Sequence, residues 1–334
     1  MTGPDRWIEP IRAAHARMRD LIVAACERQA PEQLAAVADA TGGGDTVFAI
    51  DRVGEEALRA AFAAAVPEDE PVHVIAEGLT DPLVLPQGAS ERDCRWRLLV
   101  DPIDGSRGLM YQKRSAWILS GLAPNRGPKT RLADIVLAVQ TEIPLLKQHR
   151  SDQLWAVRGR GVQARRFDRL AGTEAAIVLR PSREVTIAQG FATVVRFFPG
   201  ARDVLAAIDD DIALALAPAS PGTAGCFEDQ YASTGGQLYE LMAGHDRFVA
   251  DLRPLVQPLR AARGQPRGLC CHPYDLSTAL IAEEAGVILS DANGAPLDAP
   301  LDLATDVAWI GYANKGLRAA IEPVLKAAVL RHGL

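Results

Sequence analysis

The segment at residues 96–106 constrains the fold of this chain more than any other. It begins with Trp96-Arg97-Leu98-Leu99-Val100, a run of β-favouring residues that predicts a buried strand. It continues as Asp101-Pro102-Ile103-Asp104-Gly105-Ser106, so two carboxylates follow where the strand is expected to end. Proteins that combine helices and strands tend to place their chemistry at such strand ends. The segment therefore predicts a site at this turn, and the alternation of expected strands and helices along the chain indicates an α/β or α+β fold in layers.

Two aspartates on one tight turn can converge on a hard cation, because carboxylate oxygens are the ligands that Mg²⁺ prefers. Pro102 fixes its backbone φ and removes an amide donor, while Gly105 permits a strained turn conformation. If a helix begins here, the amides of Gly105 and Ser106 can bind an anion. The alternative is a solvated turn capped by Asp104, since Asp, Pro, Gly and Ser are the common turn residues.

Length, composition and charge exclude several classes of protein. With 334 residues the chain is long enough for two domains or one large two-part fold, and its hydrophobic content of 48% is ordinary for a globular protein. A net charge of −6 with mixed signs argues against binding to a nucleic-acid polymer. No apolar run approaches the ~18 residues of a membrane span, and the N-terminus lacks a signal-peptide pattern. We therefore expect a cytoplasmic protein without membrane association.

Two weaker patterns suggest other kinds of site. The five cysteines include no Cys-x-x-Cys pair, and no second ligand pair follows Cys270-Cys271-His272, which argues against a zinc site. Thr41-Gly42-Gly43-Gly44 suggests a dinucleotide-binding oxidoreductase, but these glycines precede a strand instead of following it. We therefore expect neither a zinc site nor a dinucleotide cofactor.

The spacing of apolar residues predicts helices and strands along most of the chain. Ile8, Ile11, Ala14, Met18 and Ile22 recur at helical spacing and indicate an amphipathic first helix. Strands are expected at residues 46–50, 72–76, 96–100, 116–123, 135–141, 154–157, 193–197, 248–250 and 309–312. Further helices are expected at residues 52–66, 201–208, 236–242, 275–285 and 317–330, and a loop at residues 41–45.

Five carboxylates each lie just after an apolar run or at the start of a predicted helix: Asp51, Glu77, Asp101, Asp104 and Asp275. Singly, each has an ordinary explanation, because Asp51 and Asp275 could cap helices and Glu77 could be a loop acid. Together they match a hydrolase with two metal ions, in which each Mg²⁺ takes several oxygens and one carboxylate commonly bridges the pair.

Five sequence blocks, in this order, carry a resemblance to a known family. The first three are Asp51 with Glu55, then Ile75-Ala76-Glu77, then the hexapeptide at residues 101–106. The fourth begins with Ser233-Thr234-Gly235-Gly236, and the fifth joins His272-Pro273-Tyr274-Asp275 to Glu284-Ala285-Gly286. This arrangement resembles the inositol monophosphatase-like family of lithium-sensitive, Mg²⁺-dependent phosphatases, whose relatives include fructose bisphosphatases and bisphosphate nucleotidases.

The resemblance implies an α+β fold of the sugar-phosphatase type, a layered αβαβα sandwich, and a homodimer. Residues 1–170 would form an N-terminal half that carries most metal ligands. Residues 171–334 would form a C-terminal half that carries the closing aspartate and the substrate contacts. Together the two halves would make one compact catalytic unit.

The resemblance also implies a role for each site residue. Glu77, Asp101 and the backbone carbonyl of Ile103 would hold one Mg²⁺, and Asp101, Asp104 and Asp275 would hold another, with two or three ions per active site. Asp51 and the Ser106 hydroxyl would orient and deprotonate the metal-activated water that attacks phosphorus. The amides of Gly105 and Ser106 would bind the phosphate, and Arg107, Gly235 and Gly236 would contact the substrate.

Four features depart from the family pattern. Gly78 stands where the family has a second Glu, Ser106 replaces Thr, and Tyr274 replaces Trp. Ten residues separate Asp275 from Gly286, one fewer than in the family, and Val287 replaces a second Gly. Within one helix, a one-residue change rotates later positions by about 100°. The register of Asp275 is therefore the least secure part of the predicted metal site.

The expected function is hydrolysis of a small phosphorylated polyol or sugar of the inositol-phosphate kind. The alternatives are a sugar bisphosphatase, a phosphoadenosine-type nucleotidase, and a degenerate relative that binds a phosphorylated ligand without turnover. Arg107, Lys113 and Arg114 could bind a second anionic group. Downstream, the strand at Phe248 is flanked by four charged residues that could approach the ligand or pair with each other: Asp246, Arg247, Asp251 and Arg253. The acid that contacts the inositol ring in this family has no clear counterpart near residues 267–268.

Overall fold

The structure is a computed structural model that describes residues 3–39, 46–79 and 81–334. The loop expected at residues 41–45, with the glycines considered for dinucleotide binding, lies outside the described residues. The helices are α1 Ile8–Arg28, α2 Pro31–Leu34, α3 Ala49–Ala65, α4 Ser106–Met110, α5 Arg202–Leu216, α6 Thr234–Ala243, α7 Gln257–Ala262, α8 Ala279–Ala285 and α9 Lys315–Arg331.

The strands form two main sheets and one short pair. Their bounds are β1 Val37–Asp39, β2 Val47–Phe48, β3 Val72–Ala76, β4 Leu83–Leu85, β5 Trp96–Asp104, β6 Ala116–Pro124, β7 Leu137–Ile143, β8 Arg150–Val157, β9 Val162–Asp168, β10 Thr173–Ala176, β11 Phe191–Val194, β12 Asp246–Asp251, β13 Ile288–Ser290 and β14 Trp309–Tyr312. An 8-stranded sheet has the order β10-β9-β8-β7-β6-β5-β3-β4, and a 4-stranded sheet has the order β11-β12-β14-β13. Neighbouring strands are antiparallel except for the parallel pairs β3–β5 and β11–β12.

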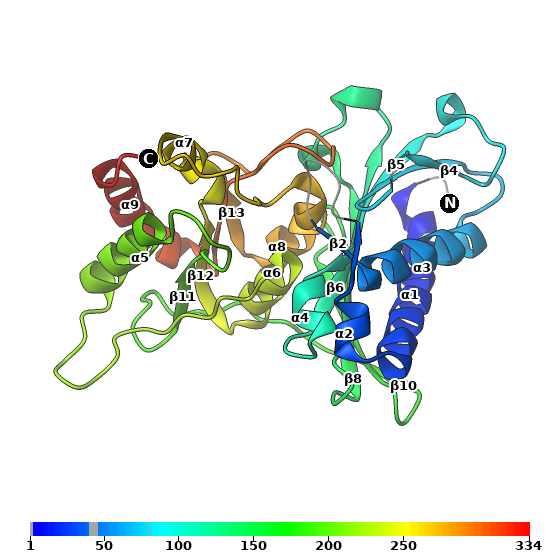
Figure 1. Ribbon diagram of the computed structural model, residues 1–334. Coiled ribbons are helices and arrows are strands. Elements are labelled where there is room, and N and C mark those ends of the chain that lie inside the picture. Colours follow the sequence, from blue (N-terminus) through cyan, green and yellow to red (C-terminus); the bar gives the residue numbers. More distant parts are fainter. Residues whose placement is uncertain (1–2, 40–45, 80) are drawn as a thin grey trace.

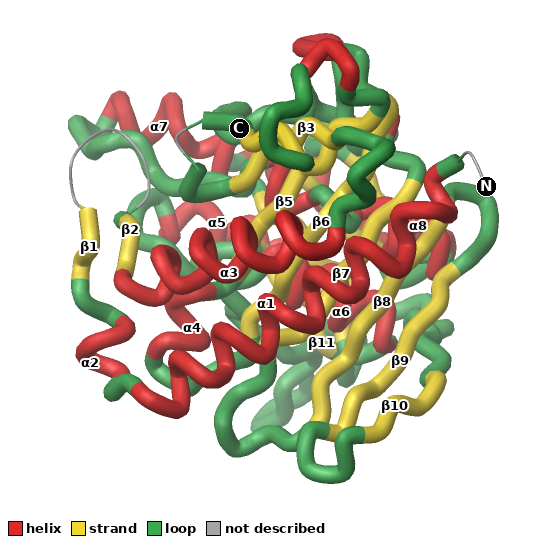
Figure 2. Tube along the Cα trace, turned by 90° about the vertical axis from the view of Figure 1, so that its right-hand side faces the viewer, coloured by secondary structure: helices red, strands yellow, loops and turns green. Residues whose placement is uncertain are grey.

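Helices and sheets alternate as layers across the molecule. Helices α1 and α3 cover one face of the 8-stranded sheet, and α6 and α8 pack between this sheet and the 4-stranded sheet. Helices α5 and α9 cover the outer face of the 4-stranded sheet (Figure 1). Figure 2 shows α1 and α3 crossing the face of the larger sheet. This αβαβα order confirms the expected layered α+β sandwich.

The central strands of the larger sheet, such as β5 and β6, are buried on both faces, which explains their near-continuous apolar sequences. In β5, Leu98 belongs to the hydrophobic cluster beneath α1 and α3, whereas its neighbour Leu99 belongs to the cluster shared with α6 and α8. Ile118 and Leu119 in β6 divide in the same way. Successive strand residues point to opposite faces of the sheet. A strand between two helical layers therefore needs apolar residues at both odd and even positions.

The structure corrects the expected ends of several elements. β5 continues to Asp104, beyond the strand end expected at residue 100, and its pairing with β6 is irregular between Asp101 and Asp104. Helix α5 runs on to Leu216, and β11 lies at Phe191–Val194 instead of residues 193–197. Strands β9 and β10 had no expected counterpart, because their exposed polar residues weaken the apolar pattern.

The helix expected at residues 275–285 is interrupted. Asp275 lies in a short 3₁₀ turn, Pro273–Leu276, and α8 begins only at Ala279. Between the two, the Ser277 carbonyl packs so closely on β6 that a Cβ at Gly121 would lie 2.6 Å from it. Because the turn and the helix are separate, the helical register of α8 does not determine where Asp275 points.

The division of the chain at residues 170/171 stays a prediction, and β10, just beyond it, pairs with β9 in the larger sheet. Among the described residues, no helix is both long enough and apolar enough to cross a bilayer.

Candidate active site

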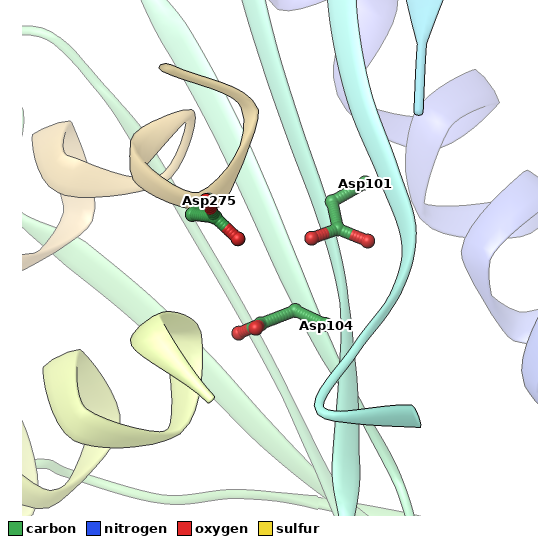
Figure 3. Close-up of side chains that lie close together, drawn as sticks. All are labelled: Asp101, Asp104 and Asp275. Carbon is green, nitrogen blue, oxygen red and sulfur yellow. The ribbon is translucent and has the colours of Figure 1, made fainter. Parts of the chain in front are cut away.

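Three aspartates from two distant parts of the chain converge at the C-terminal end of β5, an inner strand of the larger sheet. Asp101 and Asp104 project from β5, and Asp275 projects from the 3₁₀ turn that faces it (Figure 3). One carboxylate oxygen from each lies within 4.8 Å of the other two. Asp101 is only 1% exposed and Asp104 only 6%. The arrangement brings two buried carboxylates and one half-buried carboxylate, that of Asp275, to one point.

The irregular end of β5 lets two nearby aspartates point to the same side. Pro102 has no amide to donate, and the Ile103 amide donates to the Asp101 carboxylate at 3.0 Å instead of to a neighbouring strand. The parallel pairing of β3 with β5 aligns Ala76 with Val100, and the Glu77 amide donates to the Val100 carbonyl at 3.1 Å. Glu77 therefore lies beside Asp101 because of strand register.

The N-terminus of α6 holds the Asp104 carboxylate. Its Oδ2 accepts hydrogen bonds from the Ser233 hydroxyl at 2.7 Å and the Gly235 amide at 2.6 Å. The Thr234 amide donates to Oδ1 at 3.2 Å. Ser233 also caps the helix by accepting the Gly236 amide at 2.9 Å. The helix start thus orients an anion next to its positive dipole end.

Asp51 and Asp275 both cap the start of their own element. The Phe48 amide donates to Asp51 Oδ2 at 2.7 Å, and the His272 amide donates to Asp275 Oδ2 at 2.6 Å. The capping role expected as an alternative is therefore real, but it does not exclude a role in the site, because both residues also line the same cavity.

Burial and mutual repulsion make these carboxyls easier to protonate. Burial, followed by the charges of Glu77, Asp104 and Asp275, raises the pKa of Asp101 well above its ordinary value. Burial and the charge of Asp275 raise the pKa of Asp104 to about 7, against the opposing hydrogen bonds from α6. Burial also raises the pKa of Asp275 to about 7, although the His272 amide and the Arg253 charge oppose this. The repulsion would be offset by a cation.

A cavity of about 780 Å³ surrounds the three aspartates. Nearly all of the sequence-predicted site residues line it: Asp51, Glu77, Asp101, Ile103, Asp104, Gly105, Ser106, Arg107 and Asp275. Gly235 and Gly236 are not among the lining residues. Instead, the Gly235 amide holds Asp104 and the Gly236 amide holds Ser233.

The turn after β5 places backbone amides at this cavity. Gly105 has a φ of 93°, in the left-handed region, and α4 begins at Ser106. Arg107 lies over two aromatic rings, 5.5 Å from the centre of Phe48 and 5.0 Å from that of Phe198. A helix does begin at Ser106, as the anion-binding expectation requires.

Several cavity residues were missed from the sequence. Phe197, Phe198 and Asp306 lie in loops without a motif, so only the fold brings them here. Arg253 binds the buried Asp251 through Nε at 2.8 Å, so the expected pairing is confirmed. Of Asp246, Arg247, Asp251 and Arg253, only Arg253 lines the cavity, and an approach to the ligand stays a prediction.

The basic residues expected near the substrate divide between the cavity and the surface. Arg107 lines the cavity, whereas Lys113 and Arg114 are not among the lining residues. Arg114 pairs with Asp229 at 2.8 Å. The cavity wall also carries an acid, Asp306, which forms an ion pair with Arg267 at 2.5 Å. The sequence had shown no clear substrate-binding acid near residue 267.

The donor set fits a hard divalent cation. Its oxygen ligands come from buried and half-buried carboxylates that repel one another, and the Asp104 and Asp275 carboxylates are fixed by backbone amides. Oxygen-only ligands favour Mg²⁺, Ca²⁺ or Mn²⁺ over metals that prefer nitrogen or sulfur. The residues present therefore suit the cation that the sequence predicts.

Comparison with known proteins identifies the fold. No protein-family model matches the chain, and no curated protein sequence matches it. Among solved structures, it is similar to Leishmania major fructose-1,6-bisphosphatase in holo form, with a TM-score of 0.68 and 14% sequence identity. The match covers 98% of this chain and 95% of that one. The chain therefore has the fold of a fructose bisphosphatase, a relative of the family that its sequence blocks resemble.

Proposed function

We propose that this chain is a Mg²⁺-dependent phosphomonoesterase that acts on a small phosphorylated sugar or polyol. The observation that carries the proposal is the single cavity in which the buried Asp101 and Asp104 and the half-buried Asp275 meet the start of α4. Its occurrence within the fold of a fructose bisphosphatase supports the same reaction class.

The carboxylates are assigned as metal ligands. Glu77, Asp101 and the carbonyl of Ile103 would hold one Mg²⁺, and Asp101, Asp104 and Asp275 would hold another. Bound Mg²⁺ would neutralise charge on the phosphoryl group and make a nearby water more acidic. The α6 amides and the His272 amide keep the Asp104 and Asp275 oxygens in place for this purpose.

The remaining residues are assigned to the substrate and the attacking water. Asp51 and the Ser106 hydroxyl would orient this water and accept its proton, and both line the cavity. The amides of Gly105 and Ser106 would bind the phosphate oxygens. The reaction proceeds by direct attack of water on phosphorus, so none of these residues needs to become phosphorylated.

A sugar bisphosphatase is the second candidate, and one observation favours it. Arg107 lines the cavity beside the phosphate turn, where its guanidinium can bind a second anionic group. The solved structure that resembles this chain is itself named a fructose-1,6-bisphosphatase.

A phosphate-release screen tests the proposal. The panel contains inositol phosphates, a hexose bisphosphate, histidinol phosphate and a nucleoside bisphosphate, each with and without Mg²⁺ and Li⁺. We expect release that depends on Mg²⁺. The Asp104→Asn variant should lose more than about 100-fold of this activity, because even an outer partner of a metal ligand is worth 10- to 100-fold.

Asp246→Asn is the matched control, because Asp246 is also a buried carboxyl but does not line the cavity. No release from any substrate, together with no Mg²⁺ binding by calorimetry, would rule the enzyme out. Ligand binding without turnover would instead favour the degenerate relative.

A further inference from the structure

The two ring nitrogens of His272 lie in different environments. Nδ1 is 3.0 Å from the backbone carbonyl of Thr305. A carbonyl oxygen only accepts hydrogen bonds, so Nδ1 must carry the hydrogen. In the neutral ring, Nε2 is then left with its lone pair and can accept a hydrogen bond. The Thr305 carbonyl therefore fixes the tautomer.

Because Nδ1 is bound to the Thr305 carbonyl, Nε2 is the ring nitrogen that can bind a ligand. No described residue forms a hydrogen bond with it, and it is not among the fully buried polar atoms that lack a partner. The side chain is only 15% exposed, and it lines the cavity. Nε2 is thus an accessible acceptor on a largely buried ring.

The ring is held from several sides, so its direction is fixed. It packs against Tyr274 with 5.4 Å between ring centres and an interplanar angle of 35°. Its backbone amide is bound by Asp275, and Asp306 Oδ1 lies 3.8 Å from Nδ1. The ring thus lines the same cavity as the carboxylate cluster, so the alcohol part of a phosphate ester bound at the cluster would share this cavity with it.

We propose that His272 determines substrate specificity, with Nε2 accepting a hydrogen bond from a hydroxyl group on the alcohol part of the substrate. This inference rests on the proposed function and assigns the residue that recognises a hydroxyl group of the sugar or polyol phosphate. An aryl ester such as p-nitrophenyl phosphate has no hydroxyl to offer and serves as the reference substrate.

Two amide variants distinguish the roles of the two ring nitrogens. His272→Asn keeps an amide donor near Nδ1 for the Thr305 carbonyl but has no atom at the Nε2 position. His272→Gln places a polar group near Nε2. We expect His272→Asn to lower kcat/KM about tenfold for a polyol phosphate, mainly through KM, as the loss of one neutral hydrogen bond predicts. Hydrolysis of p-nitrophenyl phosphate, which offers no hydroxyl group, should fall less than that of the polyol phosphate, and His272→Gln should recover part of this difference.

Equal losses on both substrates would show a structural role and overturn the inference, as would no loss on either. His332→Asn, a histidine that does not line the cavity, is the control variant. If the wild type hydrolyses no ester at all, the proposed function fails separately. In that case, calorimetry of polyol phosphate binding to the Mg²⁺-loaded protein still tests His272, because His272→Asn should weaken binding about tenfold, and unchanged binding would overturn the inference.

Discussion

Gly78 occupies the position where a second glutamate would be expected, and its surroundings give a reason for the glycine. A Cβ at residue 78 would lie 2.7 Å from Glu55 Oε1. The Glu55 carboxylate, paired with Arg52 at 3.0 Å, thus fills the space of a side chain at residue 78 and lines the cavity beside Glu77. The Glu55 carboxylate from α3 therefore occupies the space in which a glutamate side chain at residue 78 would begin.

Gly78→Ala should destabilise the protein by about 1–2 kcal/mol, because a φ of 80° is unfavourable for a residue with a Cβ. Displacement of Glu55 should add to this cost. Gly88→Ala is the control, since Gly88 has a φ of 91° and no atom within 4 Å of its Cβ position. Urea unfolding of both variants measures the difference. If both variants lose the same unfolding free energy, displacement of Glu55 contributes nothing to the destabilisation by Gly78→Ala.

His15 should make stability depend on pH. Its ring lies between the Thr141 hydroxyl at 3.0 Å and the Ser120 hydroxyl at 2.7 Å, and burial lowers its pKa from 6.5 to about 3. The folded-state pKa lies below the unfolded value, so the neutral ring is favoured in the folded protein. Its contribution is complete above pH 6.5 and is lost as the pH falls toward 3, at about 1.4 kcal/mol per unit.

Denaturant unfolding from pH 7 to pH 4 measures this slope. The His15→Gln variant should have a shallower slope than the wild type, while His149→Gln, at an exposed position, should leave it unchanged. A wild-type slope that His15→Gln does not alter would contradict the assignment.

At the scale of elements, the sequence predicts strands better than it predicts their ends. The expected strands at residues 72–76 and 309–312 match β3 and β14 in both bounds, because apolar runs identify buried strands. The irregular end of β5 and the break before α8 were not predicted. Both depend on contacts with distant segments, Trp117 for Asp104 and Gly121 for Ser277, which periodicity cannot reveal.

The start of α6 combines a helix cap with support for Asp104, so Ser233→Ala should have two effects. Loss of the cap should cost about 1 kcal/mol in the free energy of unfolding. Loss of the hydroxyl bond to Asp104 should weaken Mg²⁺ binding about 10- to 100-fold. Calorimetry with Mg²⁺ and urea unfolding measure the two effects separately.

Asn314→Ala is the control for Ser233→Ala, because Asn314 caps α9 by accepting the Leu317 amide at 3.0 Å and does not line the cavity. It should reduce stability without changing Mg²⁺ affinity. If Ser233→Ala also leaves the affinity unchanged, Ser233 has only a structural role.

At the scale of the whole molecule, the layered order followed from the family resemblance and not from periodicity alone. Alternating patterns allowed α/β or α+β, and the order of the five blocks decided between architectures. Most predicted site residues meet in one cavity because each is attached to a strand end or helix start. Phe198 and Asp306 could not be foreseen, since loops from later in the chain reach the cavity wall only after the sheets pack together.

Mg²⁺ should stabilise the folded protein, and more so at higher pH. Asp104 and Asp275 have folded-state pKa values of about 7, above the ordinary 3.8, so the metal-free protein favours their protonated forms. Their contribution to stability is present below pH 3.8 and is lost as the pH rises through about 7. A divalent cation binds the ionised carboxylates and should therefore recover this loss.

Thermal unfolding with Mg²⁺ or with a chelator, at pH 5 and pH 8, tests this coupling. At a Mg²⁺ concentration 100 times Kd, binding should add about 2.7 kcal/mol. At pH 5 protons compete for the same oxygens, so the increase in Tm should be smaller than at pH 8. Asp104→Asn should reduce the increase at pH 8, whereas Asp246→Asn, away from the cavity, should preserve it. An increase that is equal at both pH values would show that Mg²⁺ binds outside the buried cluster.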